Sequence, residues 1–364
     1  MGDWGDFYYG RSCPKWSVTE DATIPCIRYG ELYTKFGAKI DRVYSYTNMP
    51  PENLRFSKGT EVLIPRVGED PMDYNHCTWL SMQDVAIGEM ISVFNTDNNP
   101  LFTATMFNAT LQNEFAMRVE GGSVTNLYFE KLKNIDVSFP SIPEQERIAA
   151  YFENFDHLIT LHQRKCDQAK KLKKYMLQKM FPKNNESVPE IRFEEFSDDW
   201  EQRKLSDIVD SVDTGKSKFD KEGSSGEYPI LGSTSVIGYD DEYDYEGDFI
   251  LTARVGANAG NLYRHAGKVK ISDNTVFIQT SQNIEFLYQL LMQYDVKKLS
   301  FGTGQPLVKA SELKSLELMM PTDKKEQMRI GTYLKNLDNL ITLHQKKCDQ
   351  LKNLKKFMLQ NMFV

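Results

Sequence analysis

Two long segments of the chain have the apolar spacing of an amphipathic helix. The first, residues 148–181, places Phe155, Ile159 and Cys166, among others, at intervals of three and four residues. This spacing brings the apolar side chains onto one face of a helix. The stripe is narrow, has a period near seven residues and alternates with lysine and glutamine, which is typical of a coiled-coil seam.

The second segment, residues 330–363, repeats the first without a gap, and about two in three of its positions are identical. The chain is therefore an internal duplication, and each half ends in one copy of the helix. The simplest partner for each apolar stripe is the other copy. We expect the seam to contain Phe155, Leu158, Ile159, His162, Leu172, Met176, Leu337, Leu340, Ile341, His344, Leu351, Leu354 and Met358.

Helix starts and stops can be predicted from capping residues. Ser141 with Glu144, and Asp323 with Glu326, have the spacing of a capping box, in which the N-cap residue and the residue three positions on each accept the backbone N–H of the other. Pro182 ends the first helix. The 38 residues from Glu144 to Phe181 predict a helix about 57 Å long at about 1.5 Å per residue.

Histidine and cysteine recur on the same face of both helices. His162 and His344 could suggest a metal or catalytic site, but we interpret them as half-buried, hydrogen-bonded seam residues. Cys166 and Cys348 are interpreted as small apolar seam residues.

The two globular halves differ much more than the helices but share a skeleton. A turn glycine, an apolar strand and then Arg-Val-Gly occur at residues 59–68 and again at 247–256. Short β-branched and aromatic runs broken by Gly, Asn and Asp predict mixed sheets with few helices. We expect an α+β protein with globular domains at 1–140 and 184–320 and long helices at 141–183 and 321–364.

Composition excludes several classes of protein. The chain has 364 residues, and its 44 Lys and Arg against 51 Asp and Glu give a net charge of −7, so any nucleic-acid partner must be argued from local charge. No apolar run is long enough to cross a bilayer, and the acidic, aromatic N-terminus does not look like a secretory signal. Five scattered cysteines without a C-x-x-C pair are typical of a reducing cytoplasm.

The sequence offers binding chemistry rather than an active site. Gly215-Lys216-Ser217 ends like a phosphate-binding loop, but Asp210 replaces the first glycine that such a loop needs. The lysine runs late in each helix are explained by a solvated face or by contact with a polyanion. We predict no catalytic, cofactor-binding or metal-binding residue.

Side chains of the kinds that contact base edges in a DNA groove lie beside glycines in both halves. Arg66 and Arg254 occupy the same slot of the repeat, where each could contact guanine, contact a phosphate or act as a structural clamp. The DNA-binding candidates are Arg28, Tyr29, Arg66, Lys216, Lys218, Arg254, Asn258, Arg264 and Gln305.

In its architecture and motifs, the whole chain resembles the specificity (S) subunit of type I restriction–modification systems. The motifs are the repeated entry to each helix, the repeated Leu-Ile-Thr-Leu-His-Gln run, and the opening of the second half. They lie at residues 143–148 and 321–330, at 158–163 and 340–345, and at 196–205.

The resemblance implies two target-recognition domains held apart by an antiparallel pair of long helices. Each domain would recognise one half of a bipartite double-stranded DNA site. The helices would dock two modification (methyltransferase) subunits, and restriction subunits could join them. The chain would be non-catalytic, with S-adenosylmethionine and ATP with magnesium expected on the partner subunits.

Two alternatives remain at this point. One is a self-contained methyltransferase or nuclease, and the other is a two-lobed adaptor that binds nucleic acid or protein without a restriction–modification role. One departure from the family also matters: the second half has a lead-in at 188–209 with no obvious counterpart before residue 1. It leaves the first strand of the first domain uncertain.

Overall fold

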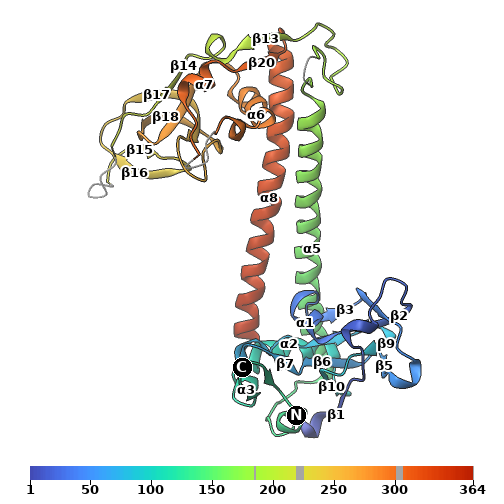
Figure 1. Cartoon of the computed structure of the whole chain (residues 1–364). Coiled ribbons are helices and arrows are strands. Elements are labelled where there is room, and N and C mark those ends of the chain that lie inside the picture. The colour runs from blue at the N-terminus through green and yellow to red at the C-terminus, as the bar shows by residue number, and fades with distance from the viewer. Residues whose placement is uncertain (184–185, 219–224, 301–305, 364) are drawn as a thin grey trace. The chain divides into compact units, whose positions relative to one another are not determined.

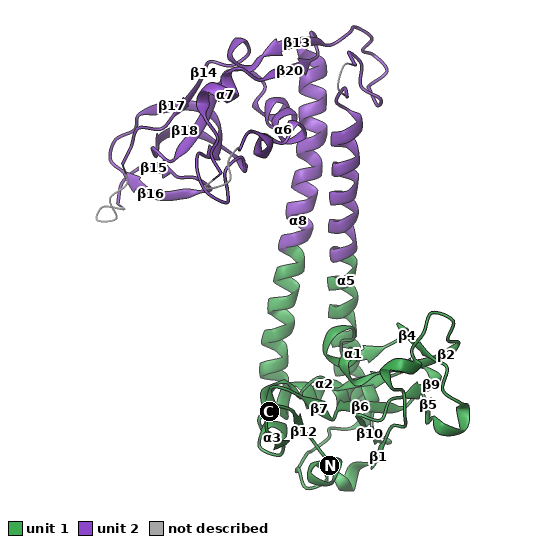
Figure 2. Ribbon diagram, viewed as in Figure 1, with its two compact units in different colours: residues 1–161, 347–364 green, residues 162–346 purple. Residues whose placement is uncertain are grey.

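The computed structural model describes residues 1–183, 186–218, 225–300 and 306–363. The chain divides into two compact units, which are described separately (Figures 1 and 2). Unit 1 comprises Met1–Leu161 and Lys347–Val364, and unit 2 comprises His162–Lys346. Each unit therefore contains one globular lobe and parts of both long helices.

The lobe of unit 1 is built on a five-stranded and a four-stranded sheet. The first has the order β1 (Asp6–Tyr9), β10 (Ile91–Asn95), β6 (Glu61–Pro65), β8 (Thr78–Leu80) and β3 (Lys39–Ile40). The second has the order β4 (Ser45–Thr47), β2 (Ile24–Ile27), β9 (Gln83–Ile87) and β5 (Phe56–Lys58). A small third sheet joins β11 (Glu120–Gly121), β12 (Thr125–Asn126) and β7 (Val67–Gly68).

Helix α2 (Pro100–Thr110) packs on β6 and β8 and supplies Phe102 and Phe107 to the core. Every residue of β6 is buried, because it is the central strand of its sheet and α2 covers it. Short helices complete the lobe: α1 (Tyr29–Thr34), α3 (Gln112–Ala116) and α4 (Phe129–Leu132).

The lobe of unit 2 has one six-stranded sheet and a two-stranded one. The larger has the order β14 (Ser211–Thr214), β19 (Thr275–Thr280), β17 (Tyr245–Ala253), β18 (Leu262–Ile271), β15 (Tyr228–Leu231) and β16 (Val236–Asp240). The smaller pairs β13 (Glu201–Lys204) with β20 (Glu317–Met320). Helices α6 (Ile284–Tyr294) and α7 (Ala310–Lys314) pack beside these sheets.

The lobes share a hydrogen-bonding plan, which confirms the skeleton expected from the sequence. The backbone N–H of Arg66 donates to the Met90 carbonyl, and that of Arg254 donates to the Asn274 carbonyl. Helices α2 and α6 both start at an asparagine, Asn99 or Asn283, whose side chain accepts a backbone N–H three residues on. The predicted α+β class is confirmed.

The long helices are α5 (Ile142–Lys179) and α8 (Lys324–Met362), and they pack antiparallel within each unit. In unit 1, Asp156 pairs with Lys355 at 2.5 Å, and Phe152 stacks on Phe363. In unit 2, Lys173 pairs with Asp338 at 2.6 Å. Asp323 accepts the Lys325 N–H, as its predicted capping role requires.

The seam differs from the sequence prediction at four leucines. Leu158, Leu172, Leu340 and Leu354 are 40%, 41%, 45% and 46% exposed and lie outside the seam. Beside Leu158 and Leu340, the next residues, Ile159 and Ile341, are themselves among the predicted seam residues. Beside Leu172 and Leu354, the seam residue is instead the lysine that follows, Lys173 or Lys355, whose side chain is largely buried and whose ammonium group reaches an aspartate.

The other predicted seam residues are buried or half-buried. The Nδ1 atoms of His162 and His344 lie 3.0 Å apart, so the two rings are within hydrogen-bond distance of each other. Cys166 and Cys348 are buried, and the Cys166 thiol lies 3.8 Å from the Ile341 carbonyl. In the part of the chain that the structure describes, no group of three or more His, Cys, Asp or Glu is placed to hold a metal ion.

Candidate nucleic-acid interface

At one edge of each lobe, a turn, the end of a strand and a segment that contains a glycine lie together. The turns are residues 88–90 and 272–274, and the strands are β6 and β17, which end just before Arg66 and Arg254. The segments that follow β1 and β14 lie against these turns. A Cβ on Gly10 would come within 2.1 Å of the Gly88 carbonyl oxygen, and one on Gly215 within 2.3 Å of the Ile271 oxygen. Only glycine fits this close approach.

Arg66 is enclosed by aromatic rings in unit 1. Its guanidinium carbon lies 4.7 Å from the Tyr9 ring centroid and 5.5 Å from that of Tyr128. Its Nη1 donates to the Glu89 carbonyl oxygen, 3.4 Å away. Cation–π contacts with two rings favour the structural role among the three considered, and the role of Arg66 stays a prediction.

Arg254 occupies the equivalent position in unit 2 with different surroundings. Its backbone is fixed, because its N–H donates to the Asn274 carbonyl and its own carbonyl accepts the Val308 N–H. Its side chain is exposed and forms no hydrogen bond or ion pair with any residue that the structure describes. A rigid backbone that presents a free guanidinium is suited to contact DNA.

The lysine candidates of unit 2 line an open cleft of about 710 Å³. Lys216 and Lys218 face it together with Tyr243, Asp240 and Lys270. Lys270 pairs with Asp240 at 3.0 Å, and this hydrogen bond raises the pKa of Lys270. Asp244 and Tyr245 also line the cleft, so it combines three lysines with two carboxylates and two aromatic rings.

The remaining DNA-binding candidates, Arg264, Asn258 and Gln305, differ in their surroundings. Arg264 forms an ion pair with Glu285, and its guanidinium lies 4.2 Å from the Tyr288 ring centroid. It is turned toward α6, so we withdraw it from the DNA-binding candidates. Asn258 is exposed, and its side-chain oxygen accepts a hydrogen bond from Asn261 at 3.0 Å. Gln305 lies outside the described residues.

Arg28 and Tyr29 begin α1 in unit 1. The Arg28 N–H donates to the Glu31 carboxylate at 2.9 Å, which fixes the start of the helix, and Tyr29 is exposed. Arg28 is half-buried, so of the two side chains only that of Tyr29 is exposed beside the strand end of β2.

The sequence analysis missed Arg11. Gly10 and Gly215 are equivalent, because their backbone N–H groups donate to the Ile91 and Thr275 carbonyls, and each is followed by an exposed basic residue, Arg11 or Lys216. The two segments lie at different distances from the Arg-Val-Gly runs of their halves, so the sequence alone does not align them. In both lobes the basic residue places a positive charge on the segment that crosses the turn.

Among the helices of the described ranges, none is long and apolar enough to span a membrane.

A family described as the type I restriction modification DNA specificity domain matches residues 80–171 and 197–353.

The curated relatives include specificity subunits of type I restriction enzymes. The chain is 27% identical over 272 residues to the type I restriction enzyme MjaVIII specificity subunit of Methanocaldococcus jannaschii, covering 66% of this chain and 64% of the relative. It is 25% identical over 250 residues to the putative MjaX specificity subunit of that organism, covering 62% and 58%. The chain thus aligns with somewhat less than two thirds of each relative.

A solved structure has the same fold. The S subunit of a type I restriction–modification system from M. genitalium superimposes with a TM-score of 0.70 at 16% identity, covering 100% of this chain and 94% of that one. At this identity the likeness concerns the fold.

Proposed function

The chain belongs to the type I restriction modification DNA specificity family, and we propose that it selects the DNA sequence at which a modification complex acts. The observation that carries this proposal is the contrast between the lobes at one shared edge. The plan of the edge is the same in both, but Arg66 is enclosed by two tyrosines while Arg254 is free. Lobes that keep their skeleton and change their exposed side chains are suited to recognise different sequences.

In this proposal, each lobe recognises one half of a bipartite site in double-stranded DNA. Residues 1–140 and 184–320 would be the recognition domains, and residues 141–183 and 321–364 the helices that set the spacing. The candidates that would face DNA are the half-buried Arg28 and the exposed Tyr29, Lys216, Lys218, Arg254 and Asn258, together with Arg11. We place the complex in the cytoplasm, where the DNA is.

The helices also offer a surface for the modification subunits. Among the large apolar side chains that the long helices expose, four in each unit, two from each helix, lie at positions related by the repeat. In the antiparallel pair, the leucines that precede seam residues lie on the same side of the seam. The exposed groups are Leu158, Leu161, Leu354 and Phe357 in unit 1, and Leu340, Leu343, Leu172 and Tyr175 in unit 2.

Exposed apolar groups of this kind mark contact sites, and two equivalent groups would bind two copies of one partner. We propose that each group docks one modification subunit. Those subunits would carry S-adenosylmethionine and the methyl-transfer chemistry, and restriction subunits with ATP and magnesium could join the same complex.

Methylation mapping of the host genome tests the function directly. Deleting the gene for this chain should remove methylation from one bipartite motif, and restoring the gene should return it. Restoring an Arg254→Ala variant should reduce methylation at sites of that motif and leave other motifs unchanged. If deletion changes no methylated motif under conditions where the chain is expressed, the proposal is wrong.

A further inference from the structure

The long helices carry free lysines on the side opposite their exposed leucines. In unit 2, Lys170 and Lys174 lie two residues before and two residues after Leu172. Residues two apart on an α-helix are separated by about 200° around its axis, so both lysines point away from the leucine. Both are exposed, and neither forms an ion pair with any residue of the described ranges.

Neighbouring positions extend this basic side. Lys171 lies three residues before Lys174, and Arg164 lies seven residues before Lys171, spacings that keep side chains on one face of a helix. One exposed carboxylate, Asp167, lies among them. The repeat continues the pattern on α8. We call the exposed basic residues of this side the basic faces: Arg164, Lys170, Lys171, Lys174 and Lys346 in unit 2, and Lys352 and Lys356, beside Asp349, in unit 1.

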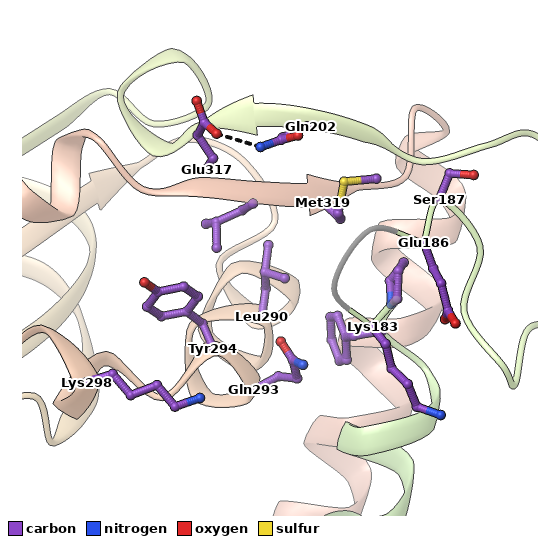
Figure 3. A pocket seen from close by; sticks show the side chains of 13 residues that line it. Lys183, Glu186, Ser187, Gln202, Leu290, Gln293, Tyr294, Lys298, Glu317 and Met319 are labelled. Atoms are coloured by element: carbon purple, nitrogen blue, oxygen red, sulfur yellow. Dashed lines mark hydrogen bonds between the residues drawn. The ribbon is translucent and has the colours of Figure 1, made fainter.

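Other lysines of the same helices are neutralised within their own unit. Lys173 pairs with Asp338 at 2.6 Å, and Lys179, the last residue of α5, pairs with Glu190. Just past the helix, Lys183 pairs with the same glutamate at 3.0 Å, and Figure 3 shows Lys183 at the edge of a pocket. The basic face of unit 2 is therefore the part of the helix pair where positive charge exceeds its carboxylate partners.

The lobe of unit 2 packs on the same side as this basic face. Asp338 lies two residues before Leu340 on α8, and so on the opposite side of the helix from that leucine. Its carboxylate accepts hydrogen bonds from Lys173 of α5 and from Gln289 of the lobe, at 2.6 and 2.8 Å. Because the exposed leucines of both helices share one side of the seam, the lobe and the basic face share the other.

We propose that the basic face of each unit contacts the backbone phosphates of the spacer DNA, next to the half-site that the lobe of that unit recognises. This inference rests on the proposed function. Duplex DNA carries one negative charge per about 1.7 Å of its axis, and ammonium groups without carboxylate partners complement it. Phosphate contacts need no particular base sequence, which suits a spacer. The leucine side stays free for the modification subunits, so both partners can bind at once.

Neutralising pairs of lysines in the assembled complex tests the proposal. The probe is a duplex with the bipartite site found by methylation mapping. Lys170→Gln with Lys174→Gln should weaken binding at least about tenfold at moderate salt and reduce the salt dependence by about two units, because two phosphate contacts are lost. Lys352→Gln with Lys356→Gln should act in the same way through unit 1.

A matched control removes the same charge elsewhere on the helices. Lys324 and Lys325 are exposed in the first turn of α8, at the other end of its unit 2 segment from Lys346. Replacing both with glutamine should leave DNA affinity and salt dependence as in the native complex. Equal melting temperatures and equal co-purification with the modification subunit exclude defects of folding or assembly.

Uncharged phosphates in the DNA locate the contact. Methylphosphonate linkages in the spacer should weaken binding of the native complex. The same linkages should have much less effect on the complex with Lys170→Gln and Lys174→Gln, because the lysines and the phosphates act as one contact. Linkages outside the bipartite site should affect both complexes equally.

Two outcomes would overturn the inference and leave the proposed function intact. One is a complex that still selects its bipartite site but keeps its affinity and salt dependence in both lysine-pair variants, since the basic faces would then only be solvated. The other is an equal loss in the control at Lys324 and Lys325, which would indicate a general effect of charge. A native complex that shows no preference for the bipartite site would instead contradict the proposed function, and this inference with it.

Discussion

Arg66 and Arg254 occupy one position of a duplicated fold and have different surroundings. The tyrosine rings around Arg66 give its charge a partner inside the lobe, whereas the side chain of Arg254 is exposed to solvent. Equivalence in the sequence therefore does not establish equivalence in function. Measured stability and measured DNA binding can separate the two roles.

We expect Arg66→Ala to lower the free energy of unfolding by about 1–2 kcal/mol, because two cation–π contacts disappear. Arg254→Ala should leave stability unchanged and weaken binding of the assembled complex to its site by about 1–3 kcal/mol. Thermal melting measures the first effect, and affinity for a panel of single-base variants at two salt concentrations measures the second. Loss at one base pair would indicate guanine contact, and uniform loss would indicate phosphate contact.

Arg11 and Lys216 lie on the shared glycine segment, so their charge is common to lobes that otherwise differ. Phosphate contacts position a protein on any sequence, whereas base contacts distinguish sequences. Arg11→Ala and Lys216→Ala should each weaken binding to all sequences alike and reduce the salt dependence by about one unit. Lys204→Ala, an exposed lysine on β13, is the control. A change in base preference from either variant would contradict this assignment.

Gln145 illustrates a repeated motif residue whose role is structural. It is fully buried, donates to the Asn98 side chain and the Pro140 carbonyl, and accepts the Asn99 N–H. Gln145→Ala should destabilise the protein by about 1–3 kcal/mol, because it leaves buried polar groups unpaired. Chemical denaturation measures the loss, and Gln168→Ala on an exposed helix face should cost almost nothing.

At the scale of elements, the repeat and the helices were predictable because their signals are local. Period, capping residues and the duplicated run of identical positions all lie within one segment. The exact seam was not predictable, because Leu172 and Lys173 compete for one position and an isolated pattern favours the leucine. What decides the competition is Asp338 on the other helix, 165 residues away along the chain.

In the lobes too, contacts between residues far apart in the sequence were not predictable. Arg264 lies beside no local acidic partner, and its ion pair with Glu285 on α6 depends on how β18 packs against that helix. The Gly-basic-Ser segment, at residues 10–12 and 215–217, was not predictable as a shared feature, because the two halves have different lengths between this segment and the Arg-Val-Gly run. The burial of Trp200 was not predictable either, because it depends on which side chains surround the ring.

The exposed leucines give a prediction for the helix pair. Leu172→Asp with Leu354→Asp should change the free energy of unfolding by no more than about 0.5 kcal/mol, since both side chains already face solvent. The same change should abolish co-purification of a tagged modification subunit. Leu351→Asp, in the buried seam, should instead cost more than about 3 kcal/mol. Marked destabilisation by the double variant would show that these two leucines pack in the seam after all.

At the scale of the whole molecule, duplication within one chain allows the two lobes to diverge while the helices stay alike. Each lobe must nevertheless keep its contacts with the helix segments of its own unit. In unit 2 these contacts are specific: Arg192 and Trp200 reach Glu326, and Gln289 donates to Asp338 at 2.8 Å. Any exchange of lobes must therefore keep them.

We expect that replacing residues 184–320 with the lobe of a relative changes one half-site and leaves the other half-site and the spacing unchanged, provided that the new lobe supplies counterparts of Arg192, Trp200 and Gln289. Without these counterparts, Glu326 and Asp338 lose their partners, and the chimera should melt at a lower temperature whatever its specificity. Methylation mapping with both chimeras separates the two effects, because only the matched one should methylate a new motif. A change in both half-sites in the matched chimera would show that the lobes do not recognise DNA independently.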